Sequence, residues 1–172
     1  MQSSDRPADM DAEEAPERRD DLNDSDLRYL RGALPALRDA HRASNVAEAG
    51  ATDPAVRALA HLSRITQADA IRSMESLLLV GGFRAGGPVR SEVPPPQERS
   101  AGAADDPSLL DGVEVDIRFI AILTAHGEAS LSRARTEMLE GFSEPCRRLA
   151  ETESRAHWGE LAAIGVLTAA HG

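Results

Sequence analysis

Residues 52–60 read TDPAVRALA, and residues 143–150 read SEPCRRLA. Each stretch opens with a hydroxyl residue, an acidic residue and a proline, which is the order typical of a helix N-terminus. The arginine, leucine and alanine that follow recur at the same offsets once one residue is skipped. The two stretches therefore predict two equivalent helices, one in each half of the chain.

A second repeat lies upstream of each stretch. Residues 26–30 read DLRYL and residues 116–120 read DIRFI. Apolar residues around both repeats step by three or four positions, which places them on one face of a helix. The spacing predicts four helices near 25–49, 53–80, 113–140 and 144–170. We expect Pro35 to kink or split the first helix and Gly81-Gly82 to stop the second.

Each half of the chain is thus predicted to be one helical hairpin. A lone hairpin cannot cover its own apolar face, so two hairpins are expected to pack together. The fold class predicted is all-α, an up-down four-helix bundle of two repeated hairpins with a ferritin-like arrangement. We assign the parts as follows: a disordered acidic tail (1–24), a first hairpin (25–82), a flexible linker (83–112) and a second hairpin (113–172), with 25–172 forming one bundle domain.

Composition excludes several function classes. The chain has a net charge of −10, its basic residues are all arginine, and six of the net negative charges fall in residues 1–24. Nucleic-acid binding is disfavoured, because phosphate contacts need a basic face and stacked bases need more aromatic rings than 3% provides. No secretory signal or 18-residue apolar run is present, so we expect a cytoplasmic protein without membrane contact.

These motifs resemble domain-of-unknown-function family 305, a ferritin-like four-helix group. The match is most specific in the second helix, at Asp53-Pro54, Leu59-Ala60, Gln67, Ile71 and Met74, and it includes Asp26, Tyr29 and Pro35 in the first. The resemblance implies a four-helix fold. It also implies metal chemistry, because some members bind copper or other metals through paired histidines and methionines.

The sequence departs from the family at those metal positions. The paired histidines correspond to Ala36-Leu37 in the first half and to His126-Gly127 in the second. The methionines correspond to Ala43, Arg133 and Ile164, and His157 replaces a glutamine. We therefore expect most of the family's metal chemistry to be lost and no cofactor to be bound, the alternative being copper or another divalent metal.

The residues leave one alternative open, which is a residual metal site. Glu153 and His157 lie four residues apart on one helical face, and His126 lies across the predicted bundle, so the three fit a two-histidine, one-carboxylate site. His41, on the stripe of the first helix, is a further candidate ligand. The competing interpretation is that Glu153 and His157 form an ordinary helical pair and that His126 is a half-buried histidine.

Cys146 and Trp158 are two further candidates for a functional role. Cys146 falls in the first turn of a predicted helix, and we interpret it as a small core residue rather than a nucleophile. Trp158 is the sole tryptophan, and we expect it to pack against a neighbouring helix rather than to line a partner surface.

The function predicted is a non-catalytic helical-bundle protein that acts as a protein-interaction or structural module. Its partner is expected to be another protein or a second copy of the chain. No acid, base and nucleophile fall together in the sequence, so an enzyme is not expected. The alternative function is a metal-binding protein that uses the residual histidine site.

Overall fold

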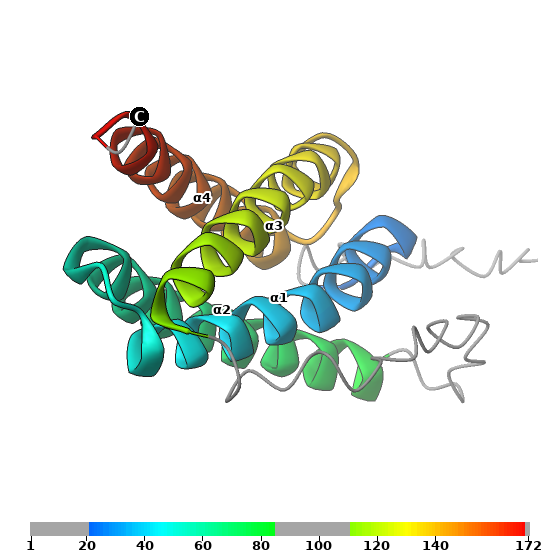
Figure 1. Cartoon of the computed structure of the whole chain (residues 1–172). Coiled ribbons are helices and arrows are strands. Elements are labelled where there is room, and N and C mark those ends of the chain that lie inside the picture. Colours follow the sequence, from blue (N-terminus) through cyan, green and yellow to red (C-terminus); the bar gives the residue numbers. More distant parts are fainter. Residues whose placement is uncertain (1–20, 85–110, 171–172) are drawn as a thin grey trace, which may run out of the picture.

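The computed structural model describes residues 21–84 and 111–170, where all regular structure is helical. The helices are α1 (Asp24–Gly50), α2 (Pro54–Arg84), α3 (Gly112–Glu140) and α4 (Glu144–Ala170). They form two hairpins, α1–α2 and α3–α4, that pack on each other (Figure 1). The predicted all-α four-helix fold is confirmed. The predicted tail and linker lie outside the described residues except at their edges.

Neighbouring helices run antiparallel. Helix α1 packs against α2 and α3, and α4 packs against α3 and α2. Helix α2 ends beside the start of α1, where Gly81 meets Leu22, and α3 starts beside the end of α1, where Gly112 meets Gly50 and Thr52. The connection from α2 to α3 must therefore join opposite ends of the bundle. One long crossover of this kind is the ferritin-like arrangement that the sequence predicts.

One local prediction is wrong, and one of the two alternatives predicted at Pro35 is excluded. Helix α2 does not stop at Gly81-Gly82 but continues to Arg84. A Cβ at Gly81 would lie 2.2 Å from a methyl carbon of Leu22, so this glycine makes room for the incoming chain rather than ending the helix. Helix α1 is not split at Pro35. The neighbouring Leu34 and Leu37 are buried in the core, and this packing outweighs the one lost backbone hydrogen bond.

The core consists of two apolar clusters, one at each end of the bundle. The first gathers around Leu30, Leu37 and Met74 and also contains the buried Cys146. The second gathers around Phe119 and Leu123. Both clusters draw side chains from all four helices, so the hairpins share one interior rather than each having its own. This sharing is what a lone hairpin lacks.

The repeated aspartates join the two hairpins. Asp116 of α3 accepts hydrogen bonds from the backbone N–H groups of Thr52 and Asp53, at 3.1 and 3.0 Å, and from the Thr52 hydroxyl. Its counterpart Asp26 of α1 accepts from the backbone N–H of Ser143, at 3.1 Å. Each aspartate therefore satisfies free backbone donors where the second helix of the other hairpin begins.

Replacing Asp116 by alanine is expected to lower the free energy of unfolding by about 1–3 kcal/mol, because three donors at the start of α2 lose their acceptor. Urea denaturation of the two proteins measures the difference. Glu128→Ala, at an exposed position of the same helix, is the control and should change stability by less than about 0.5 kcal/mol. Equal effects of both substitutions would contradict this role for Asp116.

Candidate functional site

A layer of polar side chains separates the two apolar clusters. On each helix it lies between the residues that belong to one cluster and those that belong to the other. We call it the central polar layer, and its members are Ser44, Ser63, Gln67, His126, Ser130, Glu153, His157 and Glu160. All but Glu160, which is partly exposed, are buried. Their polar groups must therefore find partners inside the protein.

Three of the four predicted site residues meet in this layer. The rings of His126 and His157 lie 5.1 Å apart in a T-shaped arrangement. The Nε2 atom of His157 lies 3.6 Å from a carboxylate oxygen of Glu153, which makes an ion pair but is too long for a hydrogen bond. His41 on α1 is only partly buried and does not line the small cavity beside this group.

A residue that the sequence analysis missed completes the network around His157. The Nδ1 atom of His157 lies 2.9 Å from a carboxylate oxygen of Glu160. The other oxygen of Glu160 accepts a 2.6 Å hydrogen bond from the Ser63 hydroxyl on α2. His157 therefore sits between two carboxylates of its own helix, and one of these carboxylates links α4 to α2. The sequence could have indicated this contact, because Glu160 lies one helical turn after His157 on the same face.

The two histidines differ in charge. Burial alone lowers the pKa of His157, but the adjacent carboxylates of Glu153 and Glu160 outweigh burial and raise the pKa to about 9. Burial, followed by the positive charge of His157, lowers the pKa of His126 to about 4. At neutral pH the layer thus holds a protonated His157 beside a neutral His126.

On the other side of His126, Ser130 and Arg133 continue the network along α3. The Ser130 hydroxyl oxygen accepts a 2.9 Å hydrogen bond from Arg133 and lies 3.5 Å from Nε2 of His126. These groups and Glu153 border a cavity of about 10 Å³, which is room for one water molecule at most. No substrate fits in a space of this size.

The arrangement is an internal charge network in which His157 pairs with two carboxylates of its own helix. A metal at His157 would have to displace a proton that two carboxylates hold in place. Among the described residues, ligand atoms of three or more histidine, cysteine or carboxylate side chains converge at only one place, and that place is outside the layer.

Comparison with known proteins supports the fold. The sequence matches no family model and no curated protein. A DUF305 fragment from Deinococcus radiodurans superposes with a TM-score of 0.66 at 18% identity, over 86% of this chain and 97% of that chain. The "putative secreted protein DUF305" from Streptomyces coelicolor superposes with a TM-score of 0.68 at 21% identity, over 84% and 91%. The chain has the DUF305 fold.

The predicted cytoplasmic location is corrected by this comparison, because one protein of the same fold is described as secreted. The prediction rested on finding no secretory signal and no long apolar run, and such an absence does not determine the compartment. Within residues 21–84 and 111–170, none of the helices has the length and apolarity needed to cross a bilayer.

The charge on His157 predicts a dependence of stability on pH. The pKa of His157 is about 9 in the folded protein and about 6.5 in the unfolded chain, so folding favours the protonated form. The resulting stabilisation, roughly 3 kcal/mol, is fully present below about pH 6.5 and is lost as the pH rises through about 9.

Chemical denaturation of wild type and His157→Gln across this pH range measures that contribution. We expect the stability difference to be largest in mild acid and to shrink above about pH 9. Thr152→Ala, at an exposed position of α4, is the control and should leave the pH profile unchanged, because it removes no titratable group. A difference between wild type and His157→Gln that stays constant with pH would contradict the network.

Proposed function

We propose that this chain is a non-catalytic helical-bundle module that binds a protein partner, either another protein or a second copy of itself, through its outer surface. The observation that carries the proposal is that the interior cavity is far smaller than a groove on the surface. The cavity at the central polar layer measures about 10 Å³, whereas a groove at the α1–α2 turn measures about 630 Å³. A volume of several hundred Å³ is typical of sites that accept a ligand or a partner side chain.

This groove is mostly apolar. It lies where α2 and α3 begin and α4 ends, and its walls include Val113, Ile117 and Leu167. Ile117 is 66% exposed, although isoleucine is among the residue types most often buried. An isoleucine left open to water beside a groove favours burial against a partner.

Trp158 adds a second exposed apolar side chain. We expected it to pack against a neighbouring helix, but it is 65% exposed on α4. Its neighbour His157 points into the central polar layer, and the helical turn directs Trp158 away from it. Tryptophan is enriched at the centres of protein interfaces, so this position supports a surface role.

Site-specific photo-cross-linking tests the proposal. A photoreactive residue at position 117 of the full chain, in cells that produce it, should yield a discrete adduct with one protein or a dimer-sized adduct. The same residue at position 128, an exposed site further along α3, should yield none. The same adducts at both positions, or no adduct at position 117, would overturn the proposal.

Metal binding at His126, His157 and Glu153 is the second candidate function. The observation in its favour is that three of the four predicted ligands meet in the central polar layer. The observation against it is that Glu153 and Glu160 already hold the proton of His157. We therefore expect Cu²⁺ binding by these residues to be weak at neutral pH and to strengthen as the pH rises.

A competition titration against a chelator measures this affinity. The titration uses a Cys146→Ser background, because this substitution removes the only thiol in the chain. We expect no tightly bound copper at neutral pH. One tight equivalent that disappears in His126→Ala and in His157→Gln would instead promote the metal-binding function.

A further inference from the structure

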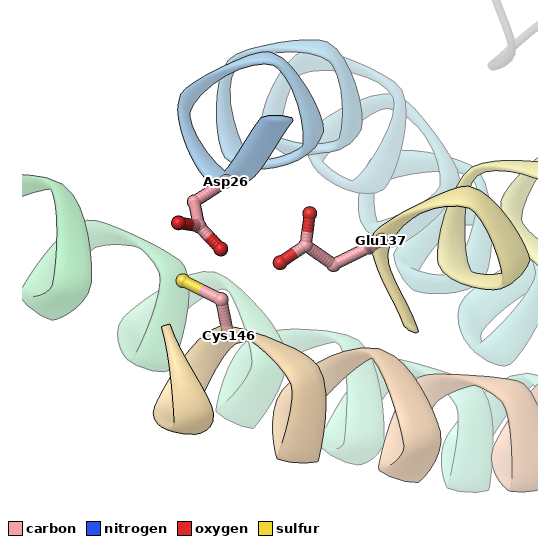
Figure 2. Close-up of side chains that lie close together, drawn as sticks. All are labelled: Asp26, Glu137 and Cys146. Atoms are coloured by element: carbon pink, nitrogen blue, oxygen red, sulfur yellow. The ribbon is translucent and has the colours of Figure 1, made fainter. Parts of the chain in front are cut away.

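A second group of ionisable side chains lies away from the central polar layer, where α1 and α4 begin and α3 ends. It consists of Asp26 from α1, Glu137 from α3 and Cys146 from α4, which point toward one another in Figure 2. One ligand atom from each residue lies within 4.8 Å of the other two. At most 1% of each residue is exposed, so the group is closed to solvent.

Glu137 has no hydrogen-bond donor in this enclosure. Both of its carboxylate oxygens are buried without a partner, and Ser25 approaches without the geometry of a hydrogen bond. Gly141 makes the space, because a Cβ there would lie 2.2 Å from a Glu137 oxygen. A buried carboxylate without a donor is destabilising unless a proton or a cation compensates it.

A further buried oxygen borders the group. The Ser143 side chain is fully buried and its hydroxyl has no hydrogen-bond partner. It lies near enough to the Cys146 thiol to influence it. The enclosure therefore combines one sulfur and two carboxylates, which are ligand types that zinc takes, with one nearby hydroxyl that has no partner.

We propose that Asp26, Glu137 and Cys146 bind a borderline divalent cation of the zinc type, with Ser143 as the nearest fourth donor. The sulfur ligand disfavours magnesium and calcium, which take oxygen ligands. The two carboxylates disfavour copper(I), which takes soft sulfur ligands. Zinc and cobalt(II) accept this mixed set in tetrahedral geometry.

The charges around the site are compatible with such an ion. A thiolate and two carboxylates carry three negative charges, and the divalent ion leaves a net charge of −1. The Arg147 guanidinium lies close enough to interact with Glu137 and opposes that remaining charge. Burial raises the pKa of the Cys146 thiol to about 12, so the thiolate forms only when the cation displaces the proton.

Binding involves no redox step. Burial raises the pKa of Glu137 to about 8, so its carboxyl carries a proton at neutral pH. The cation replaces this proton and the thiol proton of Cys146, and both protons leave to solvent. The product joins α1, α3 and α4 through one ion. Because the site is closed and its donors are fully used, its role is to hold the two hairpins together rather than to catalyse a reaction.

Cobalt(II) titration of the full, reduced, chelator-treated chain tests this proposal. We expect one equivalent to produce a thiolate-to-cobalt charge-transfer band in the near ultraviolet, and zinc to bleach it by displacement. Glu137→Gln should weaken cobalt binding by about tenfold or more, because the amide keeps the shape but loses the anionic ligand. Glu140→Gln, at an exposed position of the same helix, should leave binding unchanged.

Two further measurements control for misfolding of the variant and for binding at the central polar layer. Zinc should raise the melting temperature of wild type but not that of Glu137→Gln, whose folding is checked by circular dichroism. His157→Gln should keep the cobalt band, which separates this site from the central polar layer. The proposal is overturned by absence of the band, by unchanged affinity in Glu137→Gln, or by loss of the band in His157→Gln.

Discussion

The bundle depends on a reciprocal exchange of helix caps between its two hairpins. Asp26 and Asp116 stand at equivalent positions of the sequence repeat, and each accepts backbone N–H groups where the second helix of the other hairpin begins. These donors have no intrahelical partner, and leaving them without an acceptor would be costly, most of all at the buried Ser143. The exchange fixes how the hairpins face each other, and it accounts for the repetition of the aspartate.

The position of the central polar layer follows from the way in which these caps align the two hairpins. When the hairpins are packed in this way, His126, Glu153 and His157 lie at the same level of the bundle, between the two apolar clusters, and are buried from water. Burial of so many polar groups is tolerated because Glu160 and Ser63 complete the network around His157.

The two ionisable groups of the interior differ in how they are satisfied. His157 has a carboxylate on each side, whereas neither carboxylate oxygen of Glu137 has a hydrogen-bond partner. The charges of the first group balance one another, whereas the buried carboxylate of Glu137 needs a proton or a cation. This contrast is why an ion is proposed at Asp26, Glu137 and Cys146 rather than among the histidines, and why partner binding is assigned to the exposed apolar surface around Ile117.

The sequence by itself determined the four helices, their pairing into hairpins and the resemblance to family 305, because helical periodicity and N-terminal Asp-Pro signals are local properties. It also placed His126, His157 and Glu153 in one group from their spacing. Only the tertiary structure decided that Glu160 holds His157, that Trp158 faces outward, and that Asp26, Glu137 and Cys146 meet. These facts depend on which faces of distant helices are brought together, and spacing along one chain does not encode that geometry.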